Sequence, residues 1–235
     1  MKVDIWSDVV CPFCYIGKRR LEEALESFAH RDEVEVVWHS FQLDPSAPAI
    51  AEGRTVEKLA AKYGMTLEQA IAAQESLAAN AATVGLEFNW QQTKSGNTFD
   101  AHRLIHFAAT VGKADAMKER LLRAFFTEGE QVGDRAVLVR LAGEAGLDIE
   151  QAREVLESSA HAEEVRADIA QAQAYNIRGV PFFVIDGKYG ISGAQPTELF
   201  SQALNQAWTE AHPLQMVTTD GGATDAACEG DSCAI

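Results

Sequence analysis

The chain has 235 residues, of which 47% are hydrophobic and 23% are charged, and its formal net charge is −15. This length can bury a full hydrophobic core, and it suits one large domain or a domain with a sizeable insertion. The acidic balance disfavours nucleic-acid binding, because proteins of that class present a concentrated basic face to the phosphates. No apolar run approaches the ~18 residues that a membrane span requires, so a soluble protein that does not bind membranes is expected.

The first residues lack the pattern of a secretory leader. Asp4 and Asp8 fall where the apolar stretch of ~7–15 residues would lie. The sequence therefore favours a cytoplasmic protein, and export of a longer precursor is the open alternative. Because lasting structural disulfides are rare in the cytoplasm, closely spaced cysteines are better interpreted there as metal ligands or redox groups.

The first elements are expected to form a strand, a helix and a second strand. Lys2–Ser7 is typical of a short strand, and from Pro12 to about Phe28 apolar residues recur near the 3.6-residue period of an amphipathic helix. Residues 34–41 are then typical of a second strand. The opening of the chain is therefore predicted to be one βαβ unit.

The middle of the chain is expected to be helical, and the end to return to strands. From about residue 55 to 174 the sequence is rich in Ala, Leu, Glu and Gln, and its pattern predicts helices almost throughout. Phe182–Ile185 is a short apolar run, and Asp186-Gly187 after it predicts a hairpin into residues 188–191. Residues 196 to about 211 predict a closing helix.

The stretch CPFCYIGK, residues 11–18, places two cysteines at the predicted junction of the first strand and helix. Pro12 would take the first helical position, where its missing N–H costs nothing. Cys11 would lie near the N-cap, where unpaired N–H groups and the helix dipole lower the pKa of a thiol. Cys14, one turn inside, would be more enclosed. We therefore predict that Cys11 attacks disulfides and that Cys14 resolves the mixed disulfide.

Two other interpretations of this pair stay open. Cys11 and Cys14 could form half of a tetrahedral zinc site, with Cys228 and Cys233 as the other half, which would make the protein a zinc-binding, redox-responsive module. The pair could also be inert core cysteines, although Pro12 between them has a specific meaning at a helix start. The redox interpretation requires no metal.

A second stretch connects the pair to a known family. GVPFFV, residues 179–184, places a proline directly before an apolar strand. With CPFCYIGK and the continuation IDGKYGISGAQP, it resembles the DsbA-like branch of the thioredoxin superfamily, in which a cis-proline loop lies against a Cys-x-x-Cys. The backbone at Val180 would then hydrogen-bond an extended peptide or glutathione. The resemblance implies these active-site elements: Cys11, Cys14 and Pro181, supported by Pro12, Phe13 and Val180.

The same resemblance implies an α/β architecture, a thioredoxin fold interrupted by a large all-helical insertion. Residues 1–50 and 175–213 would form the discontinuous thioredoxin-like domain, and residues 51–174 would form the helical insertion domain. Residues 214–235 would be a flexible acidic tail that carries the second cysteine pair.

Further blocks narrow the resemblance. Ser7-Asp8, Tyr15-Ile16-Gly17 and NTFDAHR at residues 97–103 look like the FrnE-type group, which is related to 2-hydroxychromene-2-carboxylate isomerases and kappa-class glutathione transferases. Those relatives carry a serine at the position of Cys11, because they activate glutathione rather than exchange a disulfide with it. With Cys11 and Cys14 both present, thiol–disulfide exchange is favoured over a glutathione-dependent isomerase or transferase acting on a small aromatic substrate.

The expected partners are disulfide-containing or thiol proteins, with glutathione as a candidate reductant or co-substrate and no other cofactor. The protein could be a monomer or a homodimer. Phe13 and Phe182 are expected to line a hydrophobic peptide groove near the thiols. Because Phe13 adds no cation between the cysteines, an intermediate reduction potential is expected.

The tail pair is the least familiar feature. Glu229 and Asp231 lie between Cys228 and Cys233, and their charges disfavour a thiolate, so raised thiol pKa values are expected there. A pair of this kind on a tether could pass electrons to Cys11 and Cys14, because the tether raises its effective concentration. A tail of free thiols and occasional metal capture are the alternatives.

Overall fold

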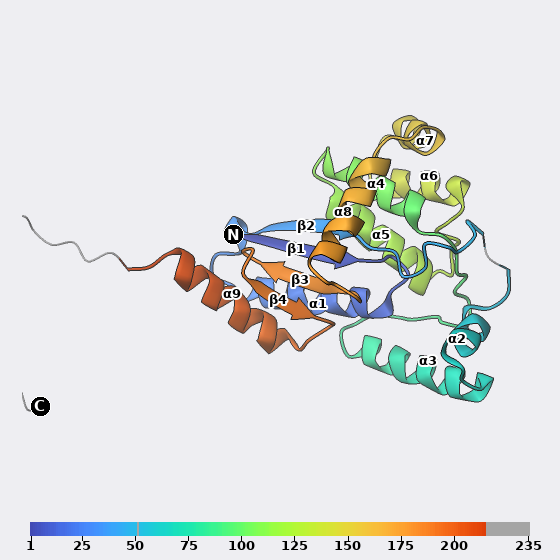
Figure 1. Cartoon of the computed structure of the whole chain (residues 1–235), viewed down its shortest axis with the longest axis horizontal. Helices are drawn as coiled ribbons and strands as arrows, with labels where there is room; N and C mark the ends of the chain where they lie inside the picture. Colours follow the sequence, from blue (N-terminus) through green and yellow to red (C-terminus); the bar gives the residue numbers. More distant parts are fainter. Residues whose placement is uncertain (51, 215–235) are drawn as a thin grey trace, which may run out of the picture.

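A mixed four-stranded sheet lies at the centre of the structure, a computed structural model that describes residues 1–50 and 52–214 (Figure 1). β1 runs parallel to β2 and antiparallel to β3, which pairs antiparallel with β4. The predicted βαβ unit and hairpin are therefore both present. The order in the sheet is β2-β1-β3-β4, with bounds Lys2–Ser7 (β1), Glu35–Ser40 (β2), Phe182–Ile185 (β3) and Tyr189–Ser192 (β4).

Two helices pack against each other beside the sheet: α1 (Pro12–Glu26) and α9 (Thr197–Ala211) (Figure 1). In α9 the buried residues recur at helical spacing, as Phe200 and Leu204 show. The Phe200 ring meets that of Phe183 on β3 edge to face, with centroids 4.7 Å apart. This packing holds the start of α1 beside the end of β1, where the first cysteine pair lies.

The other face of β1 is covered by α8 (Ala162–Ala174). Side chains alternate along a strand, so Val3 and Ile5 enter the main hydrophobic core while Trp6 points the opposite way. Trp6 packs with Ala172 of α8, and its Nε1 donates to the backbone oxygen of α8 residue 168 at 3.1 Å. The end of β1 is therefore enclosed from both sides.

The chain between β2 and β3 is helical, as predicted. α2 packs on α3, and α4 packs on α5, α7 and α8. Leu104, Leu121 and Leu138 from these helices share one hydrophobic core with Val3 and Ile5 of the sheet. The bounds are Thr55–Tyr63 (α2), Leu67–Ala82 (α3), Phe99–Ala109 (α4), Ala114–Phe126 (α5), Arg135–Glu144 (α6), Ile149–Glu157 (α7) and Ala162–Ala174 (α8).

One part of the predicted helical block is not helical. Residues 83–98 form an irregular connection. Near its start Gly85 has a φ of +73°, a left-handed conformation that favours glycine and is common after the end of a helix. Asn89 in this connection forms its shortest hydrogen bonds to the end of α5 and not within a helix. Its N–H donates to the Phe126 oxygen at 2.8 Å, and its Nδ2 donates to the Thr127 oxygen at 2.7 Å. These partners are remote in the sequence, so periodicity could not reveal them.

No helix among the residues described has the length and the apolar character that crossing a membrane would need. The domain bounds, 1–50 with 175–213 and 51–174, remain predictions. The predicted tail begins at residue 214, and Cys228 and Cys233 lie outside the described residues.

Candidate active site

The first cysteine pair lies where the sequence places it, at the start of α1. Cys11 is the N-cap residue with extended backbone (φ −91°, ψ 114°), and Pro12 follows in the first turn. The Cys14 N–H donates to the Cys11 oxygen at 3.1 Å. Both thiols are free and buried: 3% of Cys11 and 1% of Cys14 is exposed. The start of α1 therefore places both cysteines in one buried position.

The proline loop before β3 lies against Cys11. The Val180–Pro181 peptide bond is cis, and the Cys11 thiol donates to the Val180 oxygen at 3.3 Å. Gly17 on α1 permits this approach, because a Cβ there would lie 3.1 Å from both Pro181 Cγ and Phe183 Cζ. The structure thus brings Cys11, Cys14 and the cis-proline loop into one site, although the elements are about 170 residues apart in the chain.

A buried cluster of polar and charged side chains, Asp8, His102 and Lys118, lies next to the thiols. The sequence did not indicate that these residues lie together. The Asp8 carboxylate accepts from the Val9 N–H and the Leu43 N–H, each at 2.8 Å, and lies 3.3 Å from His102 Nε2. Burial disfavours the Asp8 charge, but these bonds outweigh it and hold the pKa of Asp8 below its usual range. Asp8 is therefore an anion fixed next to the Cys-x-x-Cys.

Lys118 of α5 completes the cluster, and it is 1% exposed. Its Nζ donates to the Ser7 oxygen at 3.3 Å and lies 5.4 Å from the centre of the Trp38 ring. Burial lowers the pKa of Lys118 to about 8, although the Cys14 and Asp8 sites favour its charge. No motif marks this lysine, because it comes from a helix more than 100 residues after the cysteines. Only the tertiary structure identifies it.

The two thiols titrate as a coupled pair, so the proton that one retains affects the other. The hydrogen bond to Cys14, followed by burial, raises the pKa of Cys11 well above its usual value. Burial also opposes a charge on Cys14, but the bond from Cys11 and the charge of Lys118 lower the pKa of Cys14. The Cys14 N–H favours a thiolate on Cys11, as the helix-start argument expects, yet this effect is smaller.

This distribution corrects one expectation. The sequence predicted that the helix amides hold the thiolate on Cys11, but the structure places the more acidic thiol at Cys14, beside Lys118. The physical reason is the buried ammonium group, which the sequence pattern could not locate. Access to substrate and proton exchange with Cys14 would therefore contribute to the reactivity of Cys11, together with the Cys14 N–H.

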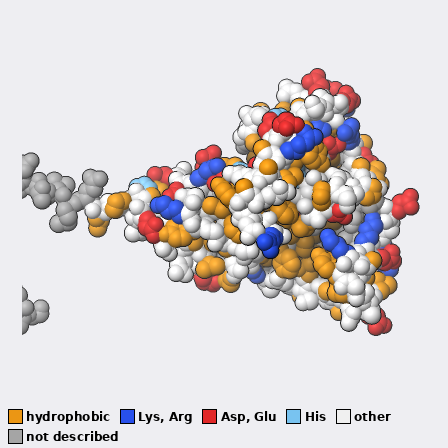
Figure 2. All heavy atoms as spheres, viewed as in Figure 1, with side chains coloured by type: hydrophobic (Ala, Val, Ile, Leu, Met, Phe, Trp, Pro, Cys, Tyr) orange, Lys and Arg blue, Asp and Glu red, His pale blue; other side chains and the backbone are white. Residues whose placement is uncertain are grey.

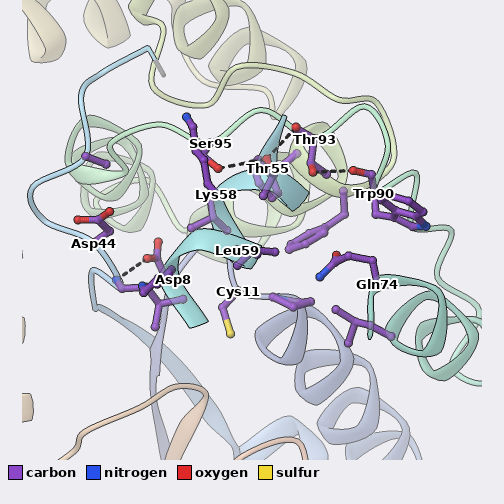
Figure 3. Close-up of a pocket in the computed structure, with 18 of the residues that line it drawn as sticks. Asp8, Cys11, Asp44, Thr55, Lys58, Leu59, Gln74, Trp90, Thr93 and Ser95 are labelled. Carbon is purple, nitrogen blue, oxygen red and sulfur yellow. Dashed lines mark hydrogen bonds between the residues drawn. The ribbon is translucent and has the colours of Figure 1, made fainter. Parts of the chain in front are cut away.

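Access differs sharply between the two sulfurs. A cavity of about 830 Å³ lies beside the start of α1, and Cys11, but not Cys14, is among its lining residues. Figure 3 shows Cys11 on one side of this cavity, with Thr55, Thr93 and Ser95 on the opposite side. In the space-filling view, hydrophobic side chains gather near the corner where Figure 1 places α2 and α3 (Figure 2). Cys11 is thus the sulfur that a molecule in the cavity would meet.

The predicted aromatic residues do not share one groove. Phe13 is 48% exposed and lines the cavity beside Cys11. Phe182 does not line it, because its position on β3 turns it toward Trp6 and Gly190. The cavity wall is instead formed by residues of α2, α3 and the irregular connection, among them Leu59, Leu77 and Trp90.

A Cys-x-x-Cys at a helix start, held against a cis-proline loop on a mixed sheet, defines the redox-active class of thioredoxin-fold proteins. Comparison with known families is more specific. The DSBA-like thioredoxin domain family matches residues 2–205, so this chain belongs to that family. The predicted fold class is thereby confirmed.

Three similar proteins illustrate the relationship. A crystal structure of the probable DsbA oxidoreductase SCO1869 from Streptomyces coelicolor is 47% identical, has a TM-score of 0.86 and covers 100% of this chain and 99% of its own. The uncharacterized protein YwbO of Bacillus subtilis (strain 168) is 31% identical over 86% of this chain and 95% of its own length. The cytosolic disulfide reductase DsbM from Pseudomonas aeruginosa with GSH is 17% identical, with a TM-score of 0.60 and coverage of 88% and 98%, and shares the fold.

Proposed function

We propose that the protein is a thiol–disulfide oxidoreductase in which Cys11 attacks a client disulfide and Cys14 resolves the mixed disulfide. One observation carries the assignment of roles: Cys11 lines the cavity and contacts the cis-proline loop, whereas Cys14 is shielded behind it. Proton transfer from Cys11 to the Cys14 thiolate would generate the attacking sulfur when a disulfide approaches. Lys118 would stabilise the single negative charge that the pair carries.

The proposed exchange takes place in two steps. The Cys11 thiolate attacks one sulfur of the client, a Cys11–client disulfide forms, and the second client sulfur leaves as a thiolate that takes a proton from solvent. Cys14 then attacks the Cys11 sulfur and releases the first client sulfur. The client gains two electrons and the protein ends with a Cys11–Cys14 disulfide. An external thiol, for which glutathione is the candidate, would return the protein to its dithiol form.

Disulfides in extended protein segments are the proposed clients. The cis-proline loop offers the Val180 backbone beside Cys11, so a client strand could pair with it while its disulfide meets the sulfur. We also propose a cytoplasmic location and an intermediate reduction potential. A neighbour of the same fold is named a cytosolic disulfide reductase and was solved with GSH, which supports the proposed location and glutathione as the candidate reductant.

Two alternatives make different demands. A glutathione-dependent isomerase acting on a small aromatic substrate is favoured by one observation, the large cavity beside Cys11. It would need no resolving thiol, so Cys14→Ala would leave it active. A zinc module would need Cys228 and Cys233, because residues 1–50 and 52–214 hold no cluster of three metal-binding side chains. Metal analysis of the reduced full-length protein separates it from the others.

Insulin reduction with glutathione as the electron source tests the proposal. The wild-type protein should turn over, Cys11→Ser should be inactive, and Cys14→Ala should stall as a mixed disulfide. A Cys228→Ser/Cys233→Ser double variant serves as the control and tests the tail. Slower turnover in it supports an electron relay through the tail, and an unchanged rate dismisses the relay without affecting the role of Cys11. Turnover in Cys11→Ser would overturn the proposed function.

A further inference from the structure

The cavity is larger than the proposed exchange with protein clients needs. Its volume of about 830 Å³ falls in the range of pockets that enclose whole small molecules, roughly 300–1,000 Å³. A client strand paired with Val180 would occupy the side next to Cys11. The cavity continues past this side to α2, α3 and residues 88–96. The far part therefore has room for a ligand that protein disulfides do not explain.

The far part is apolar and aromatic. The Phe88 and Phe126 rings stack at 4.6 Å between centroids, and both line the cavity with Trp90. Leu59 and Leu77 add aliphatic surface from α2 and α3, and Figure 3 shows Leu59 between Cys11 and Thr55. Walls of this kind favour a flat aromatic body, because rings stack on rings and apolar burial is favourable. The polar hydroxyls at the end are already bonded, as Thr55 Oγ1 donates to the Thr93 oxygen at 2.7 Å.

Two lysines of α2 line the cavity, Lys58 and Lys62, and the partly buried Lys58 is better placed to bind a ligand than the exposed Lys62. Lys58 on α2 is partly buried and forms no ion pair with any described residue within 4.0 Å. The acids on the lining are less available or lie in solvent. Asp8 already accepts its bonds, Asp44 is held by Ser46, and Glu52 is exposed. A carboxylate on the ligand would therefore find its partner in Lys58.

We infer that this cavity is a binding site for low-molecular-weight disulfides that combine an aromatic body with a carboxylate. The inference rests on the proposed exchange at Cys11 and adds a second substrate class to it. The aromatic body would lie among Phe88, Trp90 and Phe126, the carboxylate near Lys58 and one sulfur against Cys11.

The chemistry is the same two-electron exchange. The Cys11 thiolate attacks the nearer sulfur, and the other half of the ligand leaves as an aromatic thiolate. Cys14 then attacks Cys11, and the bound half leaves as the second thiolate. Two electrons pass from the dithiol to the ligand, and the Cys11–Cys14 disulfide remains. Aromatic thiolates are good leaving groups because their pKa is low, so this step is favourable in both exchanges.

Three disulfide probes separate the contributions. Dithiobis(nitrobenzoate) is aromatic and anionic, dithiodipyridine is aromatic and neutral, and hydroxyethyl disulfide is small, aliphatic and neutral. Reduced full-length protein is mixed with each, and single-turnover rates are measured against concentration. Ala73→Trp fills the cavity from an exposed position on α3, and Ala72→Trp, its exposed neighbour outside the lining, is the matched control. Ala73→Trp should weaken the binding of both aromatic probes about tenfold. It should leave the rate of reaction with hydroxyethyl disulfide unchanged.

A charge change separates the two aromatic probes. Lys58→Gln should weaken the binding of dithiobis(nitrobenzoate) about fivefold, as expected for the loss of a partly exposed ion pair. The binding of dithiodipyridine should be unchanged. Lys188→Gln, on the β3–β4 turn, controls for the net charge of the protein. Leu59→Trp repeats the filling test from α2 in case the Trp at position 73 turns outward, and thermal unfolding checks that each variant is folded.

Each outcome decides a specific question. If both filled variants are folded and reduce all three probes at wild-type rates, the cavity site is refuted while the proposed function stands. If filling slows insulin reduction as much as the aromatic probes, the cavity holds client side chains and the small-molecule inference is wrong. If the wild-type protein reduces neither insulin nor any probe, the proposed function itself fails.

Discussion

Replacing Lys118 with methionine should make the protein more stable and less reactive. The side chain is buried, donates one hydrogen bond of 3.3 Å and has no carboxylate within ion-pair distance among the described residues. Burial lowers its pKa from the ordinary 10.5 to about 8. At 1.36 kcal/mol per unit, the buried charge costs roughly 3 kcal/mol of folding free energy at neutral pH. Lys118→Met removes that cost and keeps a similar volume.

The pH dependence has a definite sign. A lysine with a lowered pKa in the folded state destabilises the fold fully below pH 8, and the penalty disappears as the pH rises from about 8 to 10.5. Urea unfolding should therefore show Lys118→Met to be more stable by roughly 3 kcal/mol near pH 7, with a difference that shrinks toward pH 10.

Reactivity should change in the opposite direction. Without the ammonium group, the first thiol pKa of the coupled pair should rise by about one unit or more, so the rate of alkylation by iodoacetamide near pH 7 should fall at least about tenfold. Lys18→Met is the matched control. Lys18 is also buried, but it pairs with Asp115 at 3.2 Å and Glu119 at 3.1 Å, so its loss should destabilise the fold and leave alkylation unchanged. An unshifted alkylation profile in Lys118→Met would refute this account of the thiols.

Three further predictions concern other parts of the site and the fold. Cys14→Ala should accumulate a mixed disulfide with a cysteine-containing peptide, visible by mass spectrometry, and rapid release of the peptide would contradict its resolving role. Burial opposes a charge on His39, but its bonds to Asp168 and Asp4, each 2.7 Å, outweigh this and raise its pKa above 6.5. The protonated His39 contributes its full stabilisation below pH 6.5, and this contribution is lost as the pH rises through the raised pKa. His39→Gln should therefore lower the free energy of unfolding mainly in acid. An equal loss at all pH values would contradict this prediction. Phe13→Ala, at a half-exposed position, should change stability by less than about 0.5 kcal/mol but lower kcat/KM for insulin more than for hydroxyethyl disulfide.

Much of the fold follows from local pattern. β1, α1 and β2 follow the alternation and helical spacing of their own residues, and the Asp186-Gly187 turn fixes the β3–β4 hairpin. Residues 83–98 could not be placed in this way, because the shortest bonds of Asn89 are to the oxygens of Phe126 and Thr127, at the end of α5. Local pattern predicts elements whose hydrogen bonds are local, and it fails where the partners are remote.

The site shows the same division. Cys11, Cys14 and Pro181 are recognisable because their residue types and immediate neighbours carry the signal. Lys118 has no such signal, and it changes which thiol is the more acidic. The environment of a functional group depends on charges that folding brings close, so the position of the pair was predictable and its protonation was not.

The proposed roles of the two thiols are tested by identifying which sulfur reacts with an alkylating reagent. Reduced protein carrying Cys228→Ser and Cys233→Ser is treated with less than one equivalent of iodoacetamide, and the modified residue is identified by peptide mapping. The label is expected on Cys11, with Cys14 unmodified although its pKa is the lower of the two, and insulin reduction should be lost in proportion to labelling. A label found mainly on Cys14, or full activity with Cys11 blocked, would contradict these roles.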